Sequence, residues 1–515
     1  MPRQFNIAGP CQPDIHYMLP PDRRFPGLRE VIEGRSYFVI HAPRQCGKTT
    51  ALMALARELT ASGRFTSVVL SMEQGQSFRT NPEGLEPAFL GGWRHSCRAH
   101  LPADLQPPEW PAADAGDRTR AALSEWALTS PRPLVIFLDE IDALQDDALI
   151  TVLRQIRAGY PDRPRAFPWS LGLVGLRDVR DYKVASGGSG HLGTASPFNI
   201  KVGSFTLENF TLDDVAELVG QHTDETGQGF ELDAIAKVWE LSRGQPWLVN
   251  ALARECVGVI RPDGSTVTAA DVAQAAQVLI RRMDTHLDSL AERLREPRVR
   301  AVMEPILAGR TADDLPADDV RYALDLGLVR RSGEGGVLVS NPIYMAVIPR
   351  MLAYVTRHGM PQVPATWLRP DGTLDQSLLL GAFLAFWRQY GQAMLASAPY
   401  AEVAAQLVLL AFLDRVANGG GSVMPEYSLG SGRIDVCLTW RGQRVGLELK
   451  VWRKGRPNPE PEGLAQLDGY LSSLGVDTGW LVIFDQRPRL RPISERTSSS
   501  VSVTPAGRQV TVVRA

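Results

Sequence analysis

The stretch that decides the fold of the N-terminal half is HAPRQCGKTT, residues 41–50. It follows a short apolar run, residues 36–41 (SYFVIH), which predicts a strand. Residues 48–62 then have helical spacing that ends at Gly63. A loop of this kind between a strand and a helix points backbone N–H groups and the positive end of the helix dipole at an anion. The sequence therefore predicts a phosphate-binding loop (P-loop).

The residue types in the loop indicate ATP with Mg²⁺. We expect Lys48 to reach the β- and γ-phosphates and the Thr49 hydroxyl to bind the metal. The usual pattern begins with glycine, whereas this chain has Ala42, which does not readily adopt a positive φ. That departure concerns loop geometry and hydrolysis rate more than nucleotide binding. The nucleotide-binding residues predicted here are Ala42, Arg44, Gly47, Lys48, Thr49 and Thr50.

An acidic strand end supplies the expected partner of the loop. Residues 134–140 (LVIFLDE) form an apolar run that closes on Asp139 and Glu140. We expect Asp139 to lie toward Mg²⁺, through water, and Glu140 to act as the base for the attacking water. The alternative is a surface turn after a buried strand. The two motifs in this order and context favour a nucleotide site.

The rest of the N-terminal half extends the pattern. Further strands are predicted at residues 66–72 and 170–176, and strands that alternate with helices favour a parallel sheet covered on both faces. Residues 211–257 are helical in pattern, and helices at 298–307 and 318–326 precede a Gly-rich hairpin at 329–339, the outline of a winged helix. The predicted fold class is α/β throughout. The predicted domains are a lead-in (1–35), P-loop core (36–210), helical lid (211–265), winged helix (266–360), linker (361–380) and second α/β domain (381–515).

Composition bounds the function only loosely. The 515 residues carry a formal net charge of −2, so there is no global attraction to nucleic acid or membrane. The 5 cysteines form no C-x-x-C pair, and the 8 histidines show no metal-ligand spacing. No apolar stretch reaches the length that crosses a bilayer, and the start of the chain lacks a signal-peptide core. We therefore expect a cytoplasmic protein with no membrane partner.

Residues 15–350 resemble the bacterial AAA-like ATPases related to the STAND and archaeal-type P-loop NTPases. The similarity rests on the P-loop and the Asp-Glu pair, together with PPDR at 20–23, GLRDVRDY at 175–182 and GQPW at 244–247. The resemblance implies that Arg177 is a nucleotide sensor, with Arg180 as a second candidate, and that Gln245 and Pro246 of the lid touch the nucleotide. The alternative for the arginines is a solvated charge pair with Asp178 or Asp181.

A second constellation lies near the C-terminus. Residues 432–440 and 445–452 alternate apolar and polar side chains, and Arg441-Gly442 between them is a plausible two-residue turn. With that turn Trp440 pairs with Gln443, which places Asp435 opposite Glu448. Glu448 and Lys450 share a face because every second side chain of a strand points to the same side of the sheet. The hairpin therefore gathers two carboxylates and a lysine, a set suited to metal-dependent phosphodiester cleavage.

Residues 381–490 resemble the PD-(D/E)XK, or restriction-endonuclease-like, superfamily. Asp435 corresponds to its aspartate and Glu448-Leu449-Lys450 to its E-x-K, although Ile434 stands where the proline is usual. The resemblance implies Mg²⁺, or Mn²⁺, at Asp435 and Glu448. It also makes Glu402, on a helix predicted over 400–414, the first-helix acid, and Gln466 and Tyr470 a Q-x-x-x-Y pair. The alternative is a half-exposed hairpin with an ordinary cross-strand Asp–Lys pair.

Three hypotheses follow. The first is an ATPase whose nucleotide state controls a metal-dependent nuclease acting on DNA, with RNA left open; the resemblance suggests defence or mobile-element biology. The second is an ATP-dependent switch or scaffold that binds nucleic acid or protein through a non-catalytic nuclease-like domain. The third is a motor-like loader or transposition regulator. A homo-oligomer or a partner protein is compatible with all three.

Overall fold

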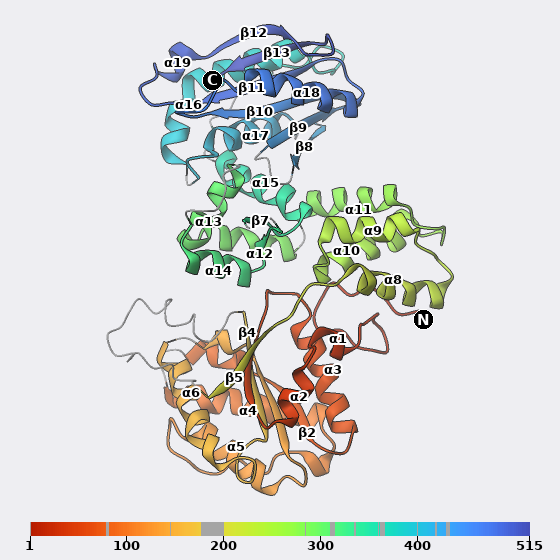
Figure 1. Ribbon diagram of the computed structural model, residues 1–515, viewed down its shortest axis with the longest axis vertical. Helices are drawn as coiled ribbons and strands as arrows, with labels where there is room; N and C mark the ends of the chain where they lie inside the picture. The colour runs from red at the N-terminus through yellow and green to blue at the C-terminus, as the bar shows by residue number, and fades with distance from the viewer. Residues whose placement is uncertain are drawn as a thin grey trace. The chain divides into compact units, whose positions relative to one another are not determined.

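The structure is a computed structural model that describes residues 2–78, 82–144, 146–176, 200–283, 285–308, 315–333, 336–358, 360, 366–398, 400–417, 420–428 and 433–515. The chain divides into two compact units. The first comprises Met1–Gln277 with Asp325–Gly327, and the second comprises Val278–Leu324 with Leu328–Ala515. Each unit has its own central sheet (Figure 1).

A five-stranded parallel sheet forms the centre of the first unit. Its order is β2-β3-β4-β1-β5, so β1 lies between β4 and β5. This arrangement confirms the predicted parallel sheet and has the form of a P-loop NTPase α/β fold. The edge strand β5 was not predicted. The strand bounds are β1 Tyr37–His41, β2 Thr66–Ser71, β3 Leu134–Asp139, β4 Ser170–Gly175 and β5 Lys201–Thr206.

Helices cover both faces of this sheet (Figure 1). On one face α3 (Lys48–Ala61) and α2 (Leu28–Glu33) pack against β1 and β3 in one apolar cluster. On the other face α4 (Pro82–His100), α5 (Arg118–Thr129) and α6 (Asp146–Gly159) form the second cluster. The central strands are buried on both sides, as parallel strands in such a sandwich are.

A group of helices, called the lid below after the prediction for residues 211–265, follows β5 in the sequence. It comprises α8 (Leu212–Thr226), α9 (Leu232–Ser242), α10 (Pro246–Glu255) and α11 (Ala269–Arg282). The turn from α9 to α10 passes through Arg243 and Gly244, which have φ values of 49° and 72°. A Cβ on Gly244 would lie 1.8 Å from the carbonyl oxygen of Phe210, so only glycine fits this turn.

The second unit begins with the elements on which the winged-helix prediction rests. Helices α13 (Pro297–Leu307) and α14 (Ala317–Asp325) precede the antiparallel pair β6 (Val329–Arg331) and β7 (Val337–Val339). They are flanked by α12 (Thr285–Leu294) and α15 (Pro342–His358). The helix–helix–hairpin order agrees with the predicted outline, and its assignment as a winged helix stays a prediction.

The C-terminal part is built on a six-stranded mixed sheet of order β12-β13-β11-β10-β9-β8. Strands β8, β9 and β10 form an antiparallel meander, while β11 runs parallel to β10. The helices are α16 (Gln376–Ser397), α17 (Ala404–Ala417), α18 (Glu460–Leu474) and the short α19 (Ile493–Arg496). The strands are β8 Gly421–Ser428, β9 Arg433–Trp440, β10 Gln443–Trp452, β11 Gly479–Asp485, β12 Ser498–Val503 and β13 Gln509–Arg514.

The predicted β9–β10 hairpin is confirmed in register. Trp440 pairs with Gln443 and Asp435 with Glu448. Arg441 and Gly442 have φ values of 44° and 85°, and positive φ at both central positions defines the two-residue turn whose twist suits a hairpin.

One expectation differs from the structure, and two strands were not expected. Glu402 lies in a turn before α17, which begins at Ala404, so the prediction that a helix over 400–414 carries Glu402 was wrong. The main-chain N–H of Glu402 instead donates to Glu304 Oε1 at 2.7 Å, which fixes the turn. The last two strands, β12 and β13, were not predicted either. Among the described residues, no helix is both long enough and apolar enough to cross a bilayer.

Candidate functional sites

The phosphate-binding loop joins β1 directly to α3. Gly47, with φ 86°, is the N-cap of α3, so the first turn of the helix opens toward the loop. The ammonium of Lys48 donates to the carbonyl oxygens of Ala42 and Pro43 at 2.6 and 2.7 Å. These bonds hold the Lys48 ammonium over the loop. A phosphate bound there would contact both the ammonium and the N-terminus of α3.

The alanine in place of the first glycine is tolerated for a local reason. Within the loop, positive φ occurs at Gln45 (55°) and Gly47 and not at Ala42. Ala42 is fully buried beneath the loop, and its N–H donates to the carbonyl of Gly175 on β4. The left-handed conformation that glycine would favour is therefore needed at other positions. Arg44 is exposed on the same loop.

Thr49 and the acidic end of β3 meet beside the loop. The Thr49 hydroxyl donates to Asp139 Oδ2 at 2.6 Å, and the Glu140 N–H donates to Asp139 Oδ1 at 2.9 Å. Burial raises the pKa of Asp139, and the hydrogen bond from Thr49 opposes that rise. A hydroxyl and a carboxylate in contact offer the hard oxygen ligands that Mg²⁺ prefers, with waters and phosphates completing its shell.

Glu140 is held by a residue that the sequence did not single out. The hydroxyl of Ser71, the last residue of β2, donates to Glu140 Oε2 at 2.5 Å. Burial of the Glu140 carboxyl raises its pKa, the Ser71 bond lowers it, and the charge of Glu73 raises it further. Strands β2 and β3 are neighbours, with Ser71 opposite Asp139, which explains why Ser71 reaches this position.

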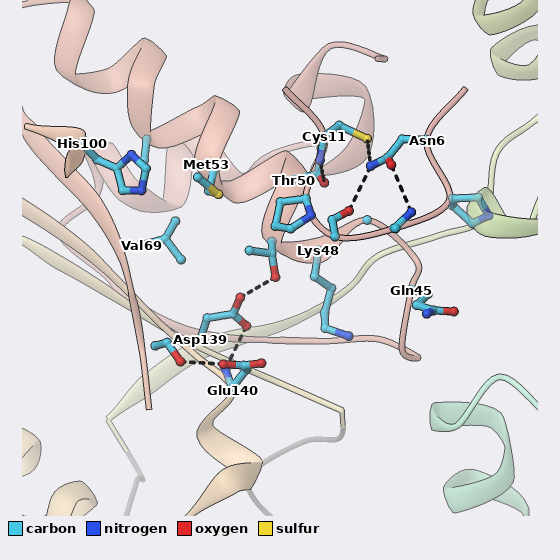
Figure 2. Close-up of a pocket in the computed structure, with 18 of the residues that line it drawn as sticks. Asn6, Cys11, Gln45, Lys48, Thr50, Met53, Val69, His100, Asp139 and Glu140 are labelled. Atoms are coloured by element: carbon cyan, nitrogen blue, oxygen red, sulfur yellow. Dashed lines mark hydrogen bonds between the residues drawn. The ribbon is translucent and has the colours of Figure 1, made fainter. Parts of the chain in front are cut away.

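A cavity of about 620 Å³ opens over these residues, within the usual range for small-molecule sites. Lys48, Asp139 and Glu140 line it (Figure 2), and so does Thr49. Figure 2 shows Asn6 and Cys11 together beside Thr50, and a second group formed by Met53, Val69 and His100.

One wall of the cavity is the N-terminal segment, which the sequence predicted only as a lead-in. The Cys11 N–H donates to the Thr50 hydroxyl at 3.0 Å, which ties the segment to α3. The Asn6 side chain organises the turn: its Nδ2 donates to the Gly9 carbonyl at 3.0 Å, and its Oδ1 accepts from the Ala8 N–H at 3.0 Å. Neither contact leaves a motif in the sequence.

The lid supplies an adjoining part of the wall through Pro246, Trp247 and Asn250. The indole of Trp247 donates to the carbonyl of Ile7 at 2.8 Å, so lid and N-terminal segment are joined. Gln245 caps α10 through its side chain and donates from Nε2 to the carbonyl of Gln45 in the phosphate loop at 3.4 Å. The predicted sensors Arg177 and Arg180 lie outside the described residues.

The second candidate site is centred on β10. The carboxylate of Glu448 is completely buried, and the Lys450 ammonium lies 3.2 Å from its Oε1. Lys450 also donates to Oε1 of Gln466 on α18 and lies 3.5 Å from the exposed carboxylate of Glu462. Gln466 in turn donates to Glu462 at 2.9 Å. Glu448, Lys450 and Gln466 therefore form one cluster, with Glu462 as a member that the sequence did not suggest.

The backbone register adds two acidic positions. Asp435 on β9 is paired on one side with Glu448 and on the other with Glu426 of β8. Three carboxylate residues thus occupy one row across three strands. Glu426 was missed because Pro425 beside it weakens the strand signal in the sequence.

The remaining predicted residues of this site lie as follows. The carboxylate of Glu402 is 3.7 Å from the guanidinium of Arg453, which follows β10. Tyr470 is buried on α18, one turn after Gln466. Among the side chains that the structure describes, no group of three or more His, Cys, Asp or Glu residues could hold a metal ion.

No protein-family model and no curated protein matches the sequence. Solved structures that are similar over much of the chain include the following three. A Walker-type ATPase of Pyrococcus abyssi is 12% identical with a TM-score of 0.44, over 66% of this chain and 98% of that one. The Thermotoga maritima RuvB branch migration motor is 17% identical with a TM-score of 0.33, over 61% and 88%. Cdc6p of Pyrobaculum aerophilum is 14% identical with a TM-score of 0.34, over 64% and 91%. Likenesses at these TM-scores assign no function.

Proposed function

We propose that the first unit binds ATP and hydrolyses it with Mg²⁺. The observation that carries this proposal is the contact between Thr49 and Asp139 beside Lys48, with Glu140 next along the chain. These four side chains come from the start of α3 and the end of β3, and all line one cavity of suitable size. A cation, a hydroxyl, a metal-binding carboxylate and a second carboxylate that can act as the base are the set that phosphoanhydride hydrolysis requires.

Each residue has a defined task in that reaction. Lys48 and the N–H groups at the start of α3 bind the β- and γ-phosphates and offset their charge. Thr49 and Asp139 would hold Mg²⁺, which supplies further positive charge at the phosphates. Glu140 accepts a proton from a water molecule while the oxygen of that water attacks the γ-phosphorus. The bond from that phosphorus to the β,γ-bridging oxygen breaks, and ADP and phosphate leave.

The test separates binding from turnover. Lys48→Ala is expected to weaken ATP binding by roughly ten- to a hundredfold, because charge-assisted contacts of this kind are worth about 1.5–3 kcal/mol. Glu140→Gln should retain ATP and lose at least a hundredfold in turnover. Wild-type levels of binding and phosphate release in both variants would contradict the proposal. Arg157→Ala, at an exposed position on α6 that does not line the cavity, is the control.

We further propose that the second unit contains a metal-dependent nuclease acting on DNA. The support is the cluster of Glu448, Lys450 and Gln466, together with the strand pairing of Glu448 with Asp435. Asp435 and Glu448 would hold Mg²⁺ or Mn²⁺, which supplies charge to the scissile phosphate. Lys450 orients the attacking water and offsets the charge that develops on the phosphate. Gln466 positions the Lys450 ammonium.

ATP state is proposed to control this cleavage. Plasmid cutting by the full chain would be compared with no nucleotide, with ADP and with ATP, in Mg²⁺ or Mn²⁺. Asp435→Ala and Lys450→Ala should each abolish cutting, and Lys48→Ala should remove its dependence on ATP. ATP-dependent binding to DNA or protein, with no cutting in any metal, would instead favour the switch or scaffold. An RNA substrate in parallel distinguishes the two nucleic acids.

A further inference from the structure

Asn250 of the lid helix α10 carries a buried acceptor that the fold does not use. The side chain is only 7% exposed, yet it lines the cavity that also contains Lys48 and Asp139. Its Nδ2 donates to the carbonyl of Pro246 at 2.8 Å. That bond fixes the orientation of the amide, because only the nitrogen end can donate. Oδ1 is then the end without a hydrogen-bond partner.

A buried carbonyl oxygen without a donor is costly, at about 1–3 kcal/mol. On a side chain that lines a cavity, such an atom is therefore evidence for a ligand that donates to it. Oδ1 of an amide is an acceptor only, so the ligand must present an N–H or O–H group. Ser67 on β2 has the other buried polar atom without a partner among the described cavity-lining residues, but its hydroxyl can donate or accept and so selects nothing.

The surroundings of Asn250 suit a flat heterocycle. The cavity wall formed by the lid and the N-terminal segment is largely apolar, comprising Ile7, Ala8, Pro10, Pro246 and Trp247. The bonds from Trp247 to Ile7 and from Cys11 to Thr50 hold this wall against both the lid and α3. Since phosphates bind at the start of α3, the base is the part of a nucleotide that such a wall would contact.

We propose that Asn250 Oδ1 accepts a hydrogen bond from the 6-amino group of adenine and selects adenine over 6-oxopurines. The inference rests on the proposed ATP site and adds the group that recognises the base. A 6-oxo group would bring two acceptors together, and a purine without a 6-substituent would leave Oδ1 unsatisfied. A ribose hydroxyl is the other donor that a nucleotide offers, and the experiment separates the two.

The test uses diphosphates, which bind without turnover, on the full chain with Mg²⁺. Calorimetry would compare ADP with purine riboside diphosphate, inosine diphosphate and 2′- and 3′-deoxyADP. We expect ADP to bind about tenfold or more tightly than purine riboside diphosphate, from the cost of the unsatisfied acceptor. Inosine diphosphate should bind more weakly still, and the deoxy compounds like ADP.

Variants then assign the effect to the amide oxygen. In Asn250→Ala the preference for ADP over purine riboside diphosphate should fall to about one. Asn250→Asp keeps an acceptor oxygen but cannot donate to Pro246, so it should retain the preference, whereas a purely structural role predicts loss in both variants. Asn209→Ala is the matched control, because Asn209 also donates to a main-chain carbonyl, that of Arg243, but does not line the cavity.

The outcomes are distinct. Equal binding of ADP and purine riboside diphosphate by the wild type overturns the role of Asn250 while the ATP site stands. If the wild type discriminates against the deoxy compounds and Asn250→Ala loses only that discrimination, then Asn250 contacts the ribose. That result also overturns the role of Asn250 in selecting adenine. No binding of any diphosphate removes the proposed ATP site and this inference with it. If Asn250→Ala does not fold, the wild-type ligand series decides alone.

Discussion

The hydroxyl of Ser71 donates to Oε2 of Glu140 at 2.5 Å, across the ends of two neighbouring strands. This bond stabilises the ionised form of the carboxylate, whose pKa is otherwise raised by burial and by the charge of Glu73. The ionised form is also the one that can accept a proton. The contact therefore bears directly on how hydrolysis should depend on pH.

The first prediction concerns that dependence. ATP turnover is expected to fall as the pH drops through the raised pKa of Glu140, because protonation removes the base. Ser71→Ala removes a contact that lowers this pKa, so the acid limb of the kcat profile should move to higher pH. The measurement is phosphate release at saturating ATP across the pH range. Ser62→Ala, at the far end of α3, is the control, and an unmoved limb in Ser71→Ala would refute the assignment.

A second prediction concerns the metal. Thr49→Ala should raise the Mg²⁺ concentration needed for half-maximal turnover several-fold or more, because Thr49 and Asp139 are the protein ligands expected at the phosphates. ATP affinity without metal should change little. Titration of activity with Mg²⁺ at fixed ATP measures the effect. A Mg²⁺ requirement identical to that of the wild type would place the metal elsewhere.

The buried pair on β10 gives a third prediction, for stability. Lys450→Ala removes the ammonium that lies beside the buried carboxylate of Glu448. Breaking a buried ion pair lowers the free energy of unfolding by about 3 kcal/mol. If Glu448 holds a divalent ion, Mn²⁺ should restore more thermal stability to this variant than it gives the wild type. Differential scanning fluorimetry with and without Mn²⁺ tests this. Glu462→Gln, at an exposed partner of Lys450, should cost under about 1 kcal/mol.

A fourth prediction concerns the lid. Gly244→Ala would force a Cβ to 1.8 Å from the Phe210 carbonyl at a φ of 72°, so it should destabilise the first unit by more than about 2 kcal/mol. Gly220 on α8 has open space where its Cβ would be. Gly220→Ala should therefore be neutral or stabilise by up to about 1 kcal/mol. Urea denaturation of both variants makes the comparison, and equal effects would contradict this account of the turn.

The sequence predicted the parts of the sites that depend on local spacing. A glycine–lysine loop between a strand and a helix, and a strand that ends in two acids, are short patterns, and the fold brings Thr49 to Asp139 as expected. The hairpin register of Asp435 and Glu448 follows from a two-residue turn and period-two alternation, and the structure agrees.

Residues that reach a site from a distant part of the chain left no such pattern. Ser71 matters because β2 lies beside β3, and Glu426 because β8 lies beside β9. Asn6 and Asn250 contribute through single amide groups on unrelated segments. Glu402 was assigned to a helix because the apolar run of α17 follows it closely, although its own backbone is held by Glu304. Most of these residues were not predicted because their positions depend on which strands are neighbours in the sheet, and tertiary packing decides that order.

The N-terminal wall has a consequence for protein engineering. Arg3 is paired with Glu225 on α8, Trp247 holds Ile7, and Cys11 holds Thr50. A transplanted strand, loop and first helix would carry the phosphate-binding residues to a new scaffold but leave behind the lid and N-terminal residues that we propose contact the base. Such a graft should bind inorganic pyrophosphate and nucleoside diphosphates alike. We therefore expect any graft that distinguishes one nucleotide from another to include at least the segment from Arg3 to Glu255.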